Sequence, residues 1–105
     1  MYRQGDILIV RIDDDAQHGV LVAREAGSVV LAHGEATGHR HRIPSLDADL
    51  YERSGVPEPT ERILHARKLV RLLHEEHDTI EIQAGKYWVL RQREYTPEAI
   101  RTVAD

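Results

Sequence analysis

Apolar residues along the chain come in short runs, each bounded by turn-forming residues. Residues 7–10 (Ile-Leu-Ile-Val) follow Gly5-Asp6 and precede a run of aspartates, which is typical of a buried strand. Ile80 and Ile82 alternate with polar residues, and residues 86–95 form the longest strand candidate. The other segments that predict strands are residues 20–22, 28–32, 39–43, 62–66 and 69–73.

Three segments fit this pattern less simply. Residues 45–60 hold one glycine and two prolines with little periodicity, so we expect a long irregular connection, with a helical turn near residues 47–53. Residues 61–76 fit either two strands or one helix, because apolar residues at 63, 66, 69, 70 and 73 also match a 3.6-residue period. Thr96, Pro97 and Glu98 resemble the start of a helix and predict a short one over residues 98–104.

Many short strands with close spacing predict an all-β fold, a small antiparallel barrel or sandwich, as a single domain over residues 1–105. Phenylalanine is absent, so the core must be aliphatic. Small barrels often leave an edge strand that a symmetric partner can cover, so we expect a homodimer.

Hydropathy and net charge lead to expectations about cellular location and nucleic-acid binding. Apolar runs fall far short of the roughly 20 residues needed to cross a bilayer, and the N-terminal residues lack the apolar segment of a signal peptide. We therefore expect a cytoplasmic protein without membrane contact. The net charge of −4 argues against non-specific binding of nucleic acid, which depends on neutralising phosphates.

Histidines carry the candidate chemistry, since five of the seven fall within residues 33–41 and 74–77. His39 and His41 would point to the same face of a strand, and His74 and His77 would converge in a turn. The chain has no cysteine, so a metal would have only nitrogen and oxygen ligands. Such ligands suit divalent zinc, iron, manganese or nickel.

We predict one divalent transition metal held by His39, His41 and His77, with His74 or Glu35 as a further ligand. On a strand, Glu94 would face the same side as Gln92 and could orient a ligand ring, and His33 would support the site from nearby. Cross-strand ion pairing is the alternative role for Glu94. The spacing of His74 and His77 is i, i+3, which differs from the i, i+4 spacing of the zincin helix.

The segment Gly38-His39-Arg-His41, followed by a β-rich half, loosely resembles the cupin superfamily. That resemblance implies a β-barrel with His39 and His41 as paired metal ligands. The carboxylate that cupins place a few residues later is missing, since residues 42–46 read Arg-Ile-Pro-Ser-Leu, and the second cupin motif is not recognisable.

A broader resemblance covers nearly the whole chain. The segments Gly34-Glu-Ala-Thr-Gly-His-Arg-His41, His74-Glu-Glu-His77 and Arg91-Gln-Arg-Glu-Tyr-Thr-Pro97 resemble a group of short bacterial and phage-associated proteins without an assigned activity. Two functional hypotheses follow from the sequence. One is a metal-binding protein that acts on a small-molecule ligand, and the other is a non-enzymatic binding or assembly module whose histidines are structural or contact a partner.

Overall fold

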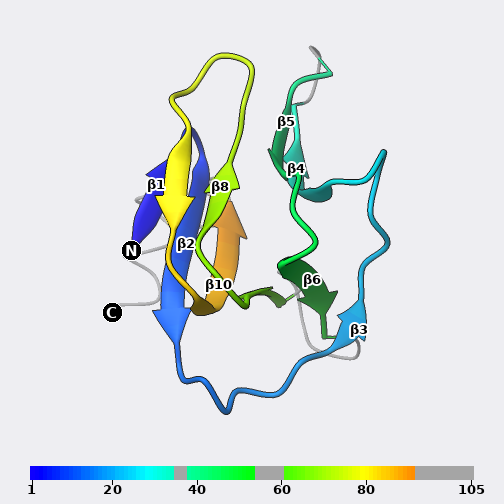
Figure 1. Ribbon diagram of the computed structural model, residues 1–105, viewed down its shortest axis with the longest axis vertical. Coiled ribbons are helices and arrows are strands. Elements are labelled where there is room, and N and C mark those ends of the chain that lie inside the picture. The colour runs from blue at the N-terminus through cyan, green and yellow to red at the C-terminus, as the bar shows by residue number, and fades with distance from the viewer. Residues whose placement is uncertain (35–37, 54–60, 92–105) are drawn as a thin grey trace, which may run out of the picture.

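The computed structural model describes residues 1–34, 38–53 and 61–91, and every regular element in these ranges is a β-strand (Figure 1). The strands are β1 (Tyr2–Gln4), β2 (Ile7–Ile12), β3 (Val20–Leu21), β4 (Val29–His33), β5 (Arg40–Ile43), β6 (Ala48–Glu52), β7 (Arg62–Ala66), β8 (Val70–Leu72), β9 (Ile80–Ile82) and β10 (Gly85–Arg91).

Six of these strands form one antiparallel sheet in the order β1-β2-β10-β7-β6-β3. The alternation predicted for the longer strands is present, since Ile7 and Ile9 of β2 are buried, as are Tyr87 and Val89 of β10. β10 pairs with β2 along Lys86–Arg91 but with β7 only through Gly85–Trp88. In the described part of the chain, the residues of β10 after Trp88 therefore pair with β2 alone.

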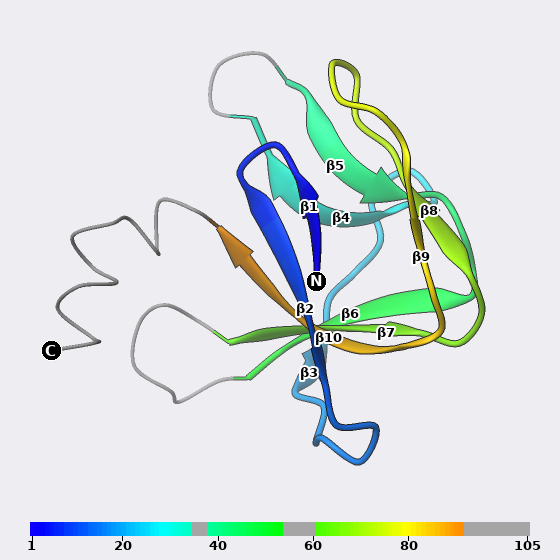
Figure 2. The same cartoon turned by 90° about the vertical axis from the view of Figure 1, so that its left-hand side faces the viewer.

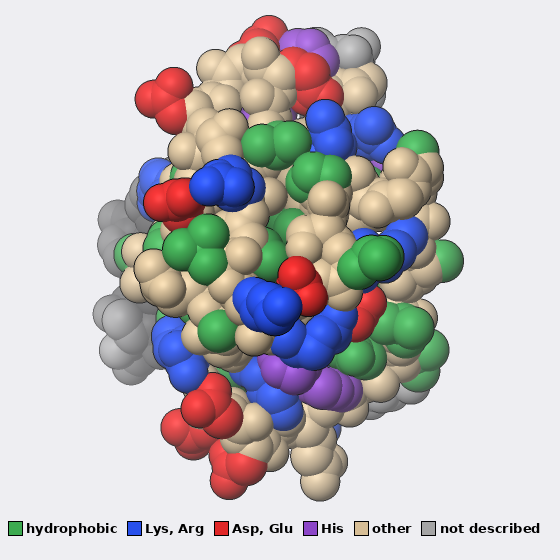
Figure 3. Space-filling view, in the orientation of Figure 1, with side chains coloured by type: hydrophobic (Ala, Val, Ile, Leu, Met, Phe, Trp, Pro, Cys, Tyr) green, Lys and Arg blue, Asp and Glu red, His purple; other side chains and the backbone are tan. Residues whose placement is uncertain are grey.

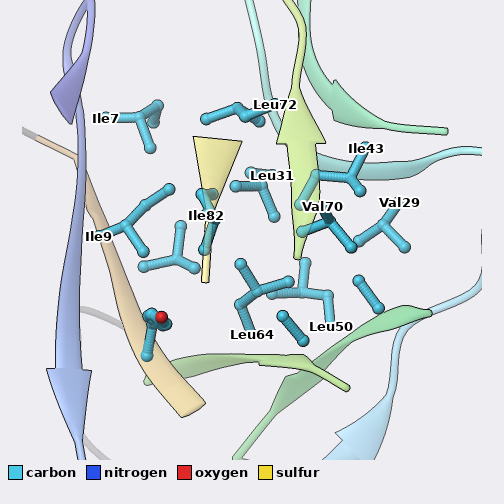
Figure 4. Packing of buried hydrophobic residues seen from close by; sticks show 14 of the residues in the cluster. Ile7, Ile9, Val29, Leu31, Ile43, Leu50, Leu64, Val70, Leu72 and Ile82 are labelled. Atoms are coloured by element: carbon cyan, nitrogen blue, oxygen red, sulfur yellow. The ribbon is translucent and has the colours of Figure 1, made fainter. Parts of the chain in front are cut away.

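The other four strands form two hairpins, β4-β5 and β8-β9. In Figure 2 the β4-β5 hairpin lies above β6 and β7, which run across the molecule. One hydrophobic core joins the sheet to both hairpins, and Figure 4 shows its side chains converging from β2, β4, β5, β6, β7, β8 and β9. Its members are almost entirely aliphatic, as the composition requires, and Tyr87 is the aromatic residue among them.

The all-β prediction is confirmed, but the closed barrel is wrong. β1 and β3 stand at opposite ends of the strand order and do not pair with each other in the part of the chain that the structure describes. The sheet stays open, and the hairpins cover the apolar face that a barrel would have enclosed. The cupin-like barrel implied by the paired histidines is corrected by the same finding.

Two local predictions also change. Residues 61–76 contain β7 and β8, so the strand alternative is confirmed and the helix is wrong. The irregular connection expected over residues 45–60 contains β6, in which Ala48 and Leu50 are buried and alternate with more exposed neighbours. The helical turn expected near residues 47–53 is therefore wrong. The helix predicted over residues 98–104 lies outside the described residues. No helix of the length and apolarity needed for a membrane span occurs in the ranges that the structure describes.

Candidate metal site

A single backbone bridge brings the two histidine segments together. The Arg42 amide donates to the carbonyl of Leu73 at 3.0 Å, and the Leu73 amide donates back at 2.8 Å. Extending this antiparallel pairing places residue 41 opposite 74, 40 opposite 75 and 39 opposite 76. In agreement, the ring centroids of His41 and His74 lie 4.3 Å apart. Backbone pairing between β5 and the chain after β8 therefore assembles the site.

Four histidines meet at this junction, and we call His39, His41, His74 and His77 the histidine cluster. His74 is the shared neighbour, since its ring centroid lies 5.6 Å from that of His39 and 4.6 Å from that of His77. Figure 3 shows histidine surface at two separate places on one face of the molecule. His18 and His65, whose ring centroids are 5.2 Å apart, form a pair distinct from the cluster.

His41 is the buried member of the cluster, and Gln4 holds it in one tautomer. The Gln4 side-chain amide donates to the carbonyls of Leu72 and Asp78, at 2.9 Å each. These two bonds use both amide hydrogens, so the Gln4 oxygen must accept from Nδ1–H of His41 at 2.8 Å. The lone pair of neutral His41 is then on Nε2. This arrangement is the one in which a metal-binding histidine donates its other ring nitrogen to a polar partner.

Protonation of His41 is disfavoured as well. Burial, followed by repulsion from His74, lowers the pKa of His41 from 6.5 to about 4. The ring is therefore neutral at physiological pH, which is the form that binds transition metals.

His39, His74 and Glu75 form the tightest group of candidate ligands. One donor atom from each lies within 4.8 Å of the other two, and no other group of three such residues meets this spacing among the described residues. The backbone amide of Arg40 donates to both Glu75 carboxylate oxygens, at 3.2 and 3.0 Å. This hydrogen bond is the main cause that lowers the pKa of Glu75, so the carboxylate stays ionised.

His74 is less ready to bind than His41. Its Nδ1 accepts the backbone amide of Glu76 at 3.0 Å, which leaves the proton of the neutral ring on Nε2. A metal at Nδ1 would replace this hydrogen bond, whereas a metal at Nε2 would require the proton to move. Either way, binding requires one local rearrangement, and at Nε2 it is also coupled to movement of a proton.

The histidine cluster lines a cavity of about 210 Å³. Asp6, Glu76 and Arg91 supply the charged part of its wall. The Arg91 side chain donates to the carbonyl of His33 at 2.6 Å, and its Nε lies 3.7 Å from the Asp6 carboxylate. A volume of this size admits an ion with water or a small ligand.

The turn between β1 and β2 closes the cavity on one side. Gln4 pairs with Ile7 across the two-residue turn Gly5-Asp6, and Gly5 has a φ of 58°, as the first position of a type II′ hairpin turn requires. A Cβ on Gly5 would lie 2.6 Å from Nε2 of His77. Glycine is therefore needed here for backbone conformation and for close approach of the His77 ring.

The structure brings together His39, His41, His74 and His77, as the sequence predicted, although ligation by any of them stays a prediction. His33 lies at the cavity wall, is largely exposed and pairs with Glu25 at 3.0 Å. Glu35 and Glu94 lie outside the described residues.

Sequence reasoning missed the contributions of Gln4, Asp6 and Glu75. A Gly-Asp pair between residues 2–4 and an apolar strand is a hairpin signal, and recognising it would have placed Gln4 and Asp6 at a turn. Glu75 stands inside the second histidine segment, so only the register of the bridge could reveal that it reaches His39 and His74.

Comparison with known proteins adds a family but no activity. No curated protein and no solved structure matches this chain. One family model matches residues 3–92, which include every described residue that lines the cavity, and its description is "Domain of unknown function (DUF8820)". Because the match spans most of the sequence, the chain belongs to the DUF8820 family.

Proposed function

We propose that this protein binds a divalent transition metal through His39, His74 and Glu75 and presents it to a small molecule in the adjoining cavity. The observation that carries the proposal is the mutual spacing of the three donor atoms, all within 4.8 Å of one another. Two imidazoles and a carboxylate suit zinc, iron, manganese or nickel.

The surroundings support a site that accepts ligands from solution. Three protein ligands leave coordination positions open, in which water or a substrate oxygen can bind. The side chain of His39 is 26 % exposed, so the group is reachable from outside. An ion in this position would act as a Lewis acid or would activate a bound water.

The alternative is a non-enzymatic assembly module in which the histidines contact a partner. The polar cavity beside the candidate ligands favours the small-molecule role, because a purely structural cluster has no need of open space next to it. Homodimer formation stays a prediction.

The test is metal retention by matched double variants. The apo-protein is loaded in turn with Zn²⁺, Mn²⁺, Ni²⁺ and, without oxygen, Fe²⁺, and is then desalted and measured by elemental mass spectrometry. We expect the wild type to retain metal and His39→Ala/His74→Ala to retain less of it. His18→Ala/His65→Ala is the control, since it removes two neighbouring histidines outside the cluster.

Circular dichroism establishes that each variant is folded. Failure of the wild type to retain any of the four ions, or equal retention by the folded His39→Ala/His74→Ala variant, would contradict the proposal.

A further inference from the structure

The buried histidine of the cluster, His41, faces a carboxylate at a distance longer than an ordinary hydrogen bond. Because Nδ1–H of His41 donates to the Gln4 oxygen, Nε2 of the neutral ring presents a lone pair. That atom lies 3.5 Å from Oδ1 of Asp6, which also presents lone pairs. Two acceptors in this position do not attract each other, and a cation between them would turn the contact into an attraction.

The length of the gap indicates which species fits. Nitrogen and oxygen ligands at roughly 2.0–2.2 Å from one tetrahedral ion lie about 3.4 Å apart. A bridging water with two ordinary hydrogen bonds would hold its acceptors about 4.5 Å apart. The 3.5 Å between His41 and Asp6 therefore matches a shared metal ion better than a shared water.

His77 supplies the third donor. Its ring is almost parallel to that of His41, at 13° with centroids 6.0 Å apart. The space left by the missing side chain of Gly5 brings His77 Nε2 against the turn that carries Asp6. Among described residues only the group of His39, His74 and Glu75 has all donors within 4.8 Å, so His77 must turn toward the ion to complete this second group.

We propose that the cavity binds a second divalent transition-metal ion, between Asp6, His41 and His77, beside the ion at His39, His74 and Glu75. The inference rests on the proposed function and extends it from a mononuclear to a dinuclear site. Each position has the same ligand set of two imidazoles and one carboxylate, and the His41 and His74 rings, 4.3 Å apart, join the two. Paired ions of this kind can polarise both ends of one substrate bond.

Stoichiometry separates the two proposals. Equilibrium dialysis of the full chain against Mn²⁺ or Zn²⁺ should give two ions per wild-type chain and one per chain in Asp6→Asn and in Glu75→Gln. Glu81→Gln, which changes an exposed carboxylate paired with Arg71, is the control and should keep two. Asp6 is about half exposed and asparagine has the same shape, so the variant is expected to fold, which circular dichroism checks.

The number of bound ions distinguishes failure of the second site from failure of the proposed function. One ion in the wild type, unchanged in Asp6→Asn, overturns the second site and leaves the proposed function standing. No ion in the wild type overturns both. A loaded wild type should also give the exchange-coupled electron paramagnetic resonance spectrum of neighbouring Mn²⁺ ions, absent from Asp6→Asn. The six-line spectrum of isolated Mn²⁺ at two equivalents would overturn the shared cavity.

Discussion

The Nδ1 atom of His41 lies 2.8 Å from the Oε1 atom of Gln4, and both side chains are almost completely buried. The contact joins β1 to β5, and through the Gln4 amide it also reaches the carbonyls on either side of the second histidine segment. The three hydrogen bonds of Gln4 thus connect β1, β5 and the second histidine segment, and they fix the tautomer of His41.

Replacing Gln4 with alanine should weaken both stability and metal binding. The change leaves two buried groups, the Leu72 carbonyl and His41 Nδ1, without their partner, and each unsatisfied buried group costs about 1–3 kcal/mol. It also removes the part-buried hydrogen bond to the Asp78 carbonyl. Gln4 orients His41, a ligand of the proposed second ion, and loss of such a supporting contact lowers metal affinity by about 10- to 100-fold. Urea unfolding and calorimetric titration measure the two effects. Gln17→Ala, at an exposed loop position, should change neither, and equal effects of the two substitutions would contradict the role of Gln4.

Gly5→Ala should destabilise the protein more than Gly27→Ala. Both glycines have positive φ, at 58° and 81°, so alanine pays a similar backbone strain of about 1–2 kcal/mol at each. Only at Gly5 would the new Cβ meet His77, at 2.6 Å, whereas nothing lies within 4 Å at Gly27. The difference between the two unfolding free energies therefore measures the contact with His77. Equal losses would show that His77 does not pack against the turn.

Stability of the metal-free protein should fall as the pH drops from about 6.5 to about 4. The pKa of His41 is about 4 in the folded state and near 6.5 when unfolded, so unfolding takes up a proton within this window. Above pH 6.5 the contribution of neutral His41 to the stability is fully present, and below pH 4 it is lost. Burial also lowers the pKa of His18 and His65, which adds in the same direction.

Urea midpoints measured across this pH range check the expectation. The His18→Ala/His65→Ala variant removes the other two contributions and should keep the part due to His41. Long-range proton–nitrogen correlation spectra should show His41 as the Nδ1–H tautomer at neutral pH. A midpoint in that variant that is constant or rises on acidification would be inconsistent with a buried neutral His41.

Metal should raise the thermal stability, and a chelator should reverse the rise. An ion that binds only the folded state adds about 2.7 kcal/mol when its free concentration is 100 times Kd. Differential scanning calorimetry with and without EDTA measures the change. The same scan on His39→Ala/His74→Ala should show a smaller rise, and an undiminished shift in that variant would place the ion elsewhere.

Much of the fold follows from local pattern. Buried alternation is clear in β2, β9 and β10, and these strands were predictable because side chains of a strand point alternately to core and surface. β1 was missed because its buried residue is Gln4, a polar side chain whose burial depends on distant carbonyls. β6 was missed because the turn-forming residues that follow it hid the alternation of Ala48 and Leu50.

The histidine cluster was predictable in membership but its geometry was not. His39 and His41 lie on or next to one strand, so their proximity is a local matter. The approach of His74 depends on the bridge between Arg42 and Leu73, a long-range pairing that alternation does not encode. The open sheet has the same origin, since strand order depends on which distant segments pair.

Metal binding by the histidine cluster is best tested by locating the bound metal in crystals of the Zn²⁺- or Mn²⁺-loaded protein. Anomalous diffraction recorded on either side of the metal absorption edge locates such ions independently of any ligand assignment. We predict a peak among His39, His74 and Glu75, with a second between Asp6, His41 and His77. A loaded crystal with no anomalous peak in this cavity would contradict the central claim that the histidine cluster binds metal.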